Sequence, residues 1–105
     1  MKNDKYTRMQ ETITDQKVQL IKGSFTPMEA TDVVLSLLDE KINFHKLQRL
    51  RWCEGYFGAD TSYADQRIAE LEAEKITARK FIRQAREMGK CLTINGTLEI
   101  TIDNP

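Results

Sequence analysis

Apolar residues recur at alternating spacings of three and four along two long stretches of the chain, and this pattern is typical of amphipathic helices. The first stretch covers residues 27–54 and the second covers residues 60–88, with Gly55 and Gly58 between them. Each predicted helix is about 27 residues long, or roughly 40 Å at the α-helical rise. Because the connection is only about six residues, the pattern predicts an antiparallel helical hairpin.

Capping signals mark the ends of both stretches. Thr26, Pro27 and Glu29 have the order of a capping box, with proline at a position where its missing N–H costs nothing. The candidate caps of the second helix are Asp60, Thr61 and Ser62. Gly89 is placed to stop the second helix, because glycine readily adopts the conformation that ends helices.

One row of positions on each helix fits the a/d seam of a heptad coiled coil. On the first helix the row contains Ala30, Val33, Leu37, Glu40, Phe44, Leu47 and Arg51. On the second helix it contains Ala64, Ile68, Leu71, Lys75, Ala78, Ile82 and Ala85. Antiparallel folding in which facing residue numbers add to 115 brings the rows together and places Glu40 opposite Lys75. We interpret this single polar layer as an ion pair that sets the register.

Blocks of charge support the same arrangement. Residues 27–40 carry four acids and no base, and residues 41–54 carry four bases and one acid. Residues 60–74 carry five acids and one base, and residues 75–90 carry six bases and one acid. Antiparallel folding therefore lays each acidic block beside a basic one, with acids at each helix start and bases at each helix end, as the helix dipole favours.

The first helix carries a second apolar stripe, which one partner helix cannot cover because a helix with a single neighbour needs only one apolar face. The stripe consists of Leu35, Leu38, Ile42, His45, Trp52 and Tyr56, and Arg49 interrupts it. The second helix adds Ile76, Phe81 and Met88 outside its seam. Two-fold interfaces reuse one patch on both copies. The sequence therefore predicts a homo-oligomer, in the simplest case a dimer, in which the six residues of this stripe form the oligomer interface, with another protein as the alternative partner.

Strand patterns flank the helices. Residues 91–102 alternate between apolar and polar side chains. Asn95-Gly96 is typical of a tight hairpin turn, but such a turn would set apolar residues against polar ones, whereas one strand bent at Gly96 keeps the apolar residues on one face. We expect one strand and keep the hairpin as the alternative. Residues 17–22 are a weaker strand candidate. Because the helical hairpin begins and ends at the same side, we expect this strand and the strand at 91–102 to be antiparallel neighbours.

The predicted fold is mainly α, an antiparallel two-helix coiled-coil hairpin flanked by N- and C-terminal β-strands in the order β-α-α-β. Two strands are marginal alone, so we expect dimerisation to complete the fold. Residues 1–15 show no firm pattern and are expected to form a mobile tail. Residues 16–105 are expected to form a single helical-hairpin domain.

Three segments carry a resemblance to known proteins: Phe25-Thr26-Pro27-Met28-Glu29-Ala30, Ile42-Asn43-Phe44-His45 and Thr93-Ile94-Asn95-Gly96-Thr97. Over residues 25–102, the chain resembles a family of small uncharacterised bacterial helical-hairpin proteins. The shared motifs are structural and include no catalytic residue. The resemblance implies a bacterial protein and no particular activity.

Charge and composition narrow the functional classes. The 105 residues have a formal net charge of zero, so no overall field draws the chain to nucleic acid or to an anionic membrane. The residues after Met1 contain no apolar run of the kind expected in a signal peptide, and no stretch reaches the roughly 18 apolar residues that a membrane span would need. Cys53 and Cys91 have no metal-binding spacing, and the helix length separates them beyond disulfide reach. We expect a cytoplasmic protein with reduced thiols and no bound metal.

The candidate chemistry is sparse. His45 is the only histidine, and its place on an apolar stripe favours a packing role over a catalytic one. Four bases, Lys41, Lys46, Arg49 and Arg51, interleave with the aromatic residues Phe44, Trp52 and Tyr56. Such a segment can follow a phosphate backbone while its rings stack on bases, although acidic block 60–74 offers these bases partners within the hairpin. The sequence contains no phosphate-binding glycine loop and no HExxH or GxSxG motif, and it predicts no cofactor.

Three functions fit these observations. The first is a non-enzymatic protein–protein interaction or scaffold module that acts as a homo-oligomer. The alternative is a nucleic-acid-binding accessory protein that uses the basic and aromatic segment 41–52. The third is a small dimeric enzyme whose site lies between protomers and uses His45, Arg49 or Arg51.

Overall fold

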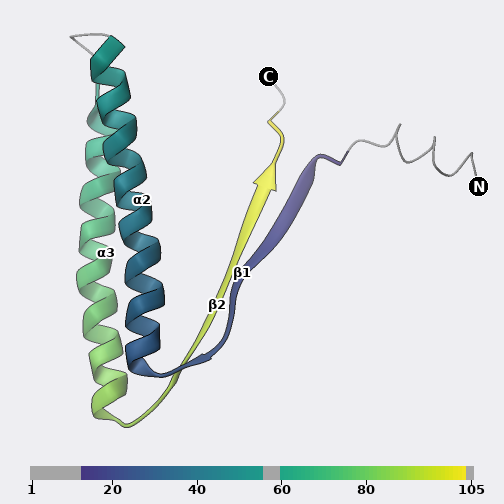
Figure 1. Ribbon diagram of the computed structural model, residues 1–105, viewed down its shortest axis with the longest axis vertical. Helices are drawn as coiled ribbons and strands as arrows, with labels where there is room; N and C mark the ends of the chain where they lie inside the picture. Colours follow the sequence, from purple (N-terminus) through teal and green to yellow (C-terminus); the bar gives the residue numbers. More distant parts are fainter. Residues whose placement is uncertain (1–12, 56–59, 104–105) are drawn as a thin grey trace, which may run out of the picture. The chain divides into compact units, whose positions relative to one another are not determined.

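The computed structural model describes residues 13–55 and 60–103 (Figure 1). Its elements are strand β1 (Asp15–Phe25), helix α2 (Pro27–Gly55), helix α3 (Ser62–Glu87) and strand β2 (Leu92–Thr101). The predicted order β-α-α-β is confirmed, with two antiparallel helices between two strands that pair with each other. The chain divides into two compact units, the helical hairpin with its adjoining residues, 24–93, and the strand pair within residues 1–23 and 94–105.

Helix α2 begins with the predicted capping box. The backbone N–H of Thr26 donates a hydrogen bond to Glu29 Oε1 at 2.9 Å, and the N–H of Glu29 donates to Thr26 Oγ1 at 3.2 Å. The first N–H groups of a helix have no partner within it, so these bonds satisfy donors that would otherwise need water. Pro27 follows at the first helical position, where its missing N–H is no loss.

Helix α3 also begins and ends at the predicted signals. Asp60 Oδ1 accepts a hydrogen bond from the backbone N–H of Ser62 at 2.9 Å, just before the first helical turn. At the other end, Gly89 has a φ of 66°, and the N–H of Lys90 donates to the carbonyl of Ala85 at 2.9 Å. This left-handed reversal is the arrangement that glycine permits without steric cost, so Gly89 ends the helix as predicted.

The hairpin has a small buried core along the line where α2 and α3 lie side by side (Figure 1). The buried residues are Ala30, Ile42 and His45 from α2, and Ala64, Leu71 and Ile82 from α3. All three residues of α3 belong to the predicted seam, which confirms the face that α3 presents. On α2 only Ala30 belongs to the predicted seam, so the rotation of α2 differs from the expectation.

Strands β1 and β2 form a two-stranded antiparallel sheet. The N–H of Ile102 donates to the carbonyl of Thr14 at 2.8 Å, and Thr97 Oγ1 donates to Gln19 Oε1 at 3.5 Å. The numbers of both pairs add to 116, so even-numbered residues of the two strands share one face. That face carries the apolar residues Val18, Leu20, Leu92, Ile94, Leu98, Ile100 and Ile102. Strand β2 runs unbroken through Gly96, which confirms the single strand and excludes the hairpin alternative.

The predicted N-terminal tail, residues 1–15, falls almost entirely outside the described residues. Its last residues are described: Thr14 accepts the hydrogen bond from Ile102, and β1 begins at Asp15. Sheet pairing therefore begins within the segment that we expected to be a tail.

Candidate interaction surface

The side of α2 that faces α3 carries the apolar stripe that we expected to be uncovered. Ile42 is 4% exposed and His45 is 2% exposed. The ring of His45 meets the ring of Tyr63 from α3 edge to face, with 6.0 Å between their centroids. Of the other members, Leu35, Leu38 and Trp52 are half-buried and Tyr56 lies outside the described residues. The expectation that this stripe stays uncovered within one chain is therefore wrong for Ile42 and His45, and the oligomer interface placed on the stripe stays a prediction.

Helix α2 packs against α3 with the second apolar stripe and not with the predicted seam, and this difference has a physical reason. Both rows follow the same three-four spacing, so spacing alone does not tell which row packs against α3. The expected seam contains two charged residues, Glu40 and Arg51, whereas the other row contains only Arg49. The row with fewer charges and larger apolar side chains is the one that is buried, because burying an apolar side chain is favourable and burying an unpaired charge is costly.

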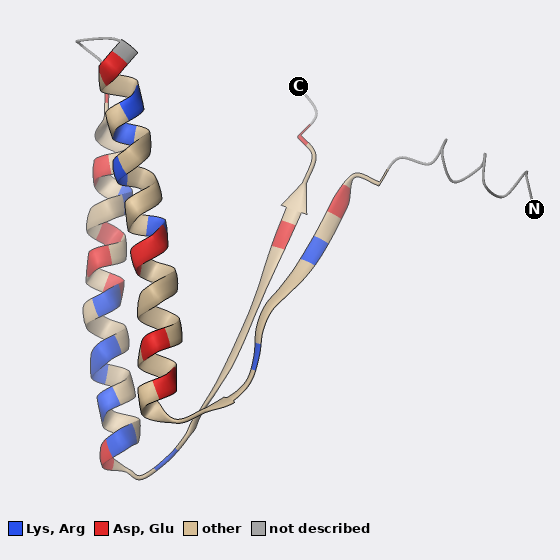
Figure 2. Cartoon of the chain, in the orientation of Figure 1, with Lys and Arg blue, Asp and Glu red and all other residues tan. Residues whose placement is uncertain are grey.

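Two ion pairs between the helices define the register. Lys75 Nζ lies 2.6 Å from Asp39 Oδ1, and Arg49 Nη1 lies 2.8 Å from Asp65 Oδ1. The numbers of both pairs, 39 with 75 and 49 with 65, add to 114, one less than predicted. The expected partner of Lys75 was Glu40, and this pairing is wrong by one residue because Asp39 lies nearer the α3 side. The acidic and basic halves of the two helices lie beside each other as predicted (Figure 2).

These contacts shift the pKa of the groups that make them. The hydrogen bond from Arg49, with a second from Thr61 Oγ1 at 3.0 Å, lowers the pKa of the Asp65 carboxyl below its ordinary value of 3.8. The hydrogen bond to Asp39 raises the pKa of Lys75. Three of the four side chains, Arg49, Asp65 and Asp39, are 42%, 50% and 58% exposed, and Lys75 is 19% exposed. Because most of these charges are solvated, the two pairs set the rotation and register of the helices more than they add to stability.

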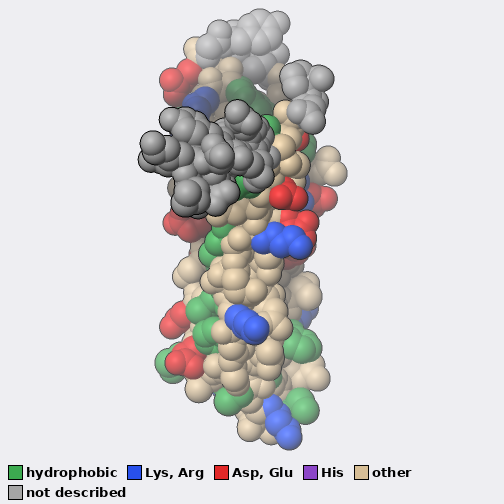
Figure 3. All heavy atoms as spheres, turned by 90° about the vertical axis from the view of Figure 1, so that its right-hand side faces the viewer, with side chains coloured by type: hydrophobic (Ala, Val, Ile, Leu, Met, Phe, Trp, Pro, Cys, Tyr) green, Lys and Arg blue, Asp and Glu red, His purple; other side chains and the backbone are tan. Residues whose placement is uncertain are grey.

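The opposite side of α2 exposes the row that we expected to form the seam. Leu37, Phe44 and Leu47 are 40%, 49% and 47% exposed, Leu50 beside them is 55% exposed, and Val33 is half-buried. We call these five residues the outer stripe. Hydrophobic side chains also reach the surface at scattered points on the side shown in Figure 3, as they do on any protein. Five apolar residues along one side of a helix, with only Glu40 between Leu37 and Phe44, are different, because larger apolar patches mark interaction surfaces.

The four bases proposed for nucleic-acid contact have different environments. Lys41 Nζ lies 5.0 Å from the centre of the Phe44 ring, a cation–π contact at the edge of the outer stripe. Of the others, Lys46 and Arg51 are exposed and Arg49 is held in its ion pair with α3. Trp52 is half-buried on the side of α2 that faces α3. A basic side chain therefore contacts an aromatic ring at Lys41 and Phe44, but basic and aromatic side chains do not alternate on one surface throughout residues 41–52.

His45 has the packing role that the sequence predicts. Its Nδ1 lies 3.1 Å from Gln48 Oε1, within hydrogen-bond distance. The other nitrogen, Nε2, is buried and has no hydrogen-bond partner among the described residues. A buried polar atom without a partner has a desolvation cost. Within the described ranges, no group of three or more His, Cys, Asp or Glu side chains could hold a metal ion.

The two cysteines are separated along the hairpin. Cys53 lies in the last turn of α2, and Cys91 follows α3 at the opposite end. Both are exposed free thiols. Their separation agrees with the prediction that they do not form a disulfide with each other.

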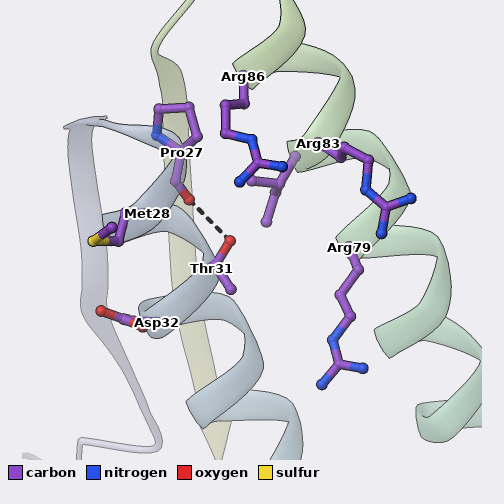
Figure 4. Close-up of a pocket in the computed structure, with 8 residues that line it drawn as sticks. Pro27, Met28, Thr31, Asp32, Arg79, Arg83 and Arg86 are labelled. Carbon is purple, nitrogen blue, oxygen red and sulfur yellow. Dashed lines mark hydrogen bonds between the residues drawn. The ribbon is translucent and has the colours of Figure 1, made fainter.

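A pocket of about 330 Å³ lies between the first turn of α2 and the last third of α3 (Figure 4). Its lining consists of Pro27, Met28, Thr31, Asp32, Arg79, Ile82, Arg83 and Arg86. The three arginines share one side of α3, but Figure 4 shows their side chains pointing in different directions instead of toward a common point. The pocket also contains the acid Asp32. It therefore offers no converging set of donors for an anion.

Helix α3 exposes the apolar residues that we placed outside its seam. They are Ile76 and Phe81 within α3 and Met88 directly after its end, and each is more than half exposed. Ile76 follows the buried Leu71 by five residues and precedes the buried Ile82 by six, so it lies on the side of α3 away from α2. The three residues are spread along the helix and do not form a row like the outer stripe of α2.

No protein-family model, curated protein or solved structure matches the chain. The resemblance to small bacterial helical-hairpin proteins stays a prediction. In residues 13–55 and 60–103, no helix is both long enough and apolar enough to cross a lipid bilayer. A proposal on function must therefore come from the residues themselves, and the outer stripe is the strongest candidate among them.

Proposed function

We propose that this chain is a non-enzymatic protein–protein interaction module, a helical-hairpin scaffold that binds another protein chain through the outer stripe. The observation that carries this proposal is the exposure of Leu37, Phe44 and Leu47 on the side of α2 opposite to Ile42 and His45, which are buried. A helix that already buries one apolar face has no need of a second for folding. Large apolar side chains in a solvent-excluded centre are what protein interfaces use for affinity.

The hairpin is suited to present this surface. The capping box fixes the start of α2, and the Asp39–Lys75 and Arg49–Asp65 pairs fix its rotation relative to α3. The outer stripe is therefore held on a helix that is already folded, which lowers the entropy lost on binding. Exposed free thiols at Cys53 and Cys91 suit a reducing compartment, and we propose that the module works in the cytoplasm.

Site-specific photo-crosslinking in the cells that make the protein tests this function. A benzophenone amino acid placed at Phe44 reports chains that lie on the outer stripe, and the same group at Ile76 is the control because Ile76 is similarly exposed on the far side of α3. We expect covalent protein adducts from position 44 and few from position 76. Equal or absent adducts at the two positions would overturn the proposal.

The second candidate function is a nucleic-acid-binding accessory protein that uses residues 41–52. It is supported by the exposure of Lys41, Lys46 and Arg51 and by the contact of Lys41 with Phe44. Fluorescence anisotropy with a single-stranded oligonucleotide decides the matter. Binding that weakens by about tenfold or more between low and moderate salt, and that Lys41→Glu abolishes, would favour this candidate over the interaction module.

A further inference from the structure

The predicted seam row of α2 without its buried first residue, Ala30, is here called the outer row, and its spacing reads the same in both directions. Its positions are 33, 37, 40, 44, 47 and 51, and the gaps between them are four, three, four, three and four. A two-fold axis perpendicular to the helix therefore superposes the row on itself, pairing 33 with 51, 37 with 47 and 40 with 44. In antiparallel coiled coils, facing a and d positions meet in this way. The row can therefore pack against another copy of itself.

Charge distinguishes an antiparallel from a parallel arrangement. Asp39 and Arg49 are held by α3, so the other charges of α2 decide. The first half of α2 carries Glu29, Asp32 and Glu40 with no base, whereas the second half carries Lys41, Lys46 and Arg51 with the single acid Glu54 (Figure 2). An antiparallel copy brings each acidic half to a basic half, whereas a parallel copy sets acid against acid and base against base.

We propose that the chain that covers the outer stripe is a second copy of this protein, with the two α2 helices antiparallel and facing residue numbers adding to 84; this rests on the proposed function. Leu37 of each copy then packs on Leu47 of the other, and this contact occurs twice. Phe44 faces Glu40 of the other copy, beside the Lys41 amine that already lies over the ring. The acid and the amine then form a polar layer that fixes the register.

Cysteine crosslinking tests both the partner and its direction. In a background with Cys53→Ser and Cys91→Ser, both mild because these thiols are exposed, Val33→Cys and Arg51→Cys are purified separately and then mixed. The antiparallel register brings position 33 of one copy against position 51 of the other, within disulfide reach. Two copies of position 33 are then about 27 Å apart along the axis.

Mild oxidation should therefore link Val33→Cys to Arg51→Cys in the mixture, while Val33→Cys alone stays unlinked. Linking of Val33→Cys to itself would show a parallel pair and overturn the proposal. Failure of both to link would also overturn it. Light scattering after size exclusion supplies an independent readout, since the wild type should have the mass of a dimer at micromolar concentration and a monomeric wild type would overturn the proposal.

Two variants show that the outer stripe carries the contact. Leu47→Glu should weaken dimerisation by about tenfold or more while circular dichroism stays helical, because Leu47 is exposed in one chain and its loss does not disturb the hairpin. Ile76→Glu is the matched control and should remain dimeric. If Leu47→Glu remains a dimer, the contact lies elsewhere and the proposal is overturned.

The photo-crosslinking experiment separates this inference from the function on which it rests. Adducts at Phe44 with the mass of two copies support both. Adducts with a different protein, together with a monomeric purified chain, overturn the self-association and leave the interaction module standing. The absence of any adduct at Phe44 overturns both.

Discussion

Lys75 Nζ lies 2.6 Å from Asp39 Oδ1, and this pair links the middle of α2 to the middle of α3. Glu72 Oε1 also lies 3.7 Å from the amine, so Lys75 is near carboxylates from both helices. Glu40, the neighbour of Asp39, is exposed and belongs to the same helical row as Leu37 and Phe44. Adjacent acids on one helix therefore have different roles, one in the hairpin and one on the surface that we propose for assembly.

The first prediction concerns this pair. Asp39→Lys and Lys75→Asp should each lower the urea midpoint of unfolding, because each sets like charges side by side, and the double variant should recover part of the loss. Glu40→Lys with Lys75→Glu is the matched control and should show no such recovery. The four midpoints of each cycle are the measurement. Recovery in the Glu40 cycle and not in the Asp39 cycle would contradict the observed rotation of α2.

The second prediction concerns the buried histidine. Because Nε2 of His45 has no partner among the described residues, His45→Leu should raise the free energy of unfolding by about 1 kcal/mol, within the cost of a buried unsatisfied group. Gln48 is only half-buried and can turn its amide to water when the imidazole is gone. The exposed neighbour Asn43→Ala is the control and should change stability by less than about 0.5 kcal/mol. A clear loss of stability in His45→Leu would indicate that Nε2 has a partner.

The third prediction concerns the end of α3. Gly89→Ala forces a side chain into the left-handed region and should cost about 1–2 kcal/mol, although there is free space around the position. Gly96→Ala is the matched control, because Gly96 is in an extended strand and an added Cβ would also meet nothing within 4 Å. Denaturant unfolding followed by helical circular dichroism measures both. Similar losses of unfolding free energy in the two variants would argue that the left-handed backbone of Gly89 is not the cause.

The fourth prediction concerns pH. The hydrogen bonds from Arg49 and Thr61 lower the pKa of Asp65, so the folded form favours the charged carboxylate more than the unfolded form does. The stabilisation is present above the ordinary value of 3.8 and is lost as the pH falls through the lower folded pKa. The difference in unfolding midpoint between wild type and Asp65→Asn should therefore be constant near pH 7 and shrink below about pH 4. Hydrogen bonds from Ser62 also lower the pKa of Asp60. Because Asp60 is present in both proteins, its contribution to the pH dependence cancels in this comparison. A difference that does not change with pH would show that the carboxylate contact contributes nothing.

The boundaries of the two helices could be predicted from sequence because local chemistry determines them, whereas β1 is longer at both ends than the predicted 17–22. The reciprocal bonds of Thr26 and Glu29, and the left-handed Gly89, each depend on residues within a few positions along the chain. The buried face of α3 could be predicted for a related reason, since α3 has only one complete apolar row. The strand that passes through Gly96 could be predicted because its alternation leaves one face apolar.

The rotation of α2 could not be predicted from spacing, because its two apolar rows have the same period. The choice between them depends on the charges that each row would bury. The predicted seam would bury Glu40 and Arg51, whereas the second apolar stripe would bury only Arg49. Arg49 sits at the edge of the hairpin, where it reaches Asp65 and stays solvated. A comparison of the charges in the two rows was the available signal, and it would have assigned Leu37, Phe44 and Leu47 to the surface.

Helices α2 and α3 are of similar length, but they should not accept mutations equally. Around α3, a single apolar row occupies about a third of the circumference, so most single polar replacements there should be neutral. Around α2, the row containing Ile42 and the row containing Phe44 lie on opposite sides, which leaves only two narrow flanks free to vary. In a survey of all single substitutions, α2 should show two intolerant rows half a turn apart and α3 only one. Over evolutionary time, the two halves of this hairpin should therefore diverge at different rates.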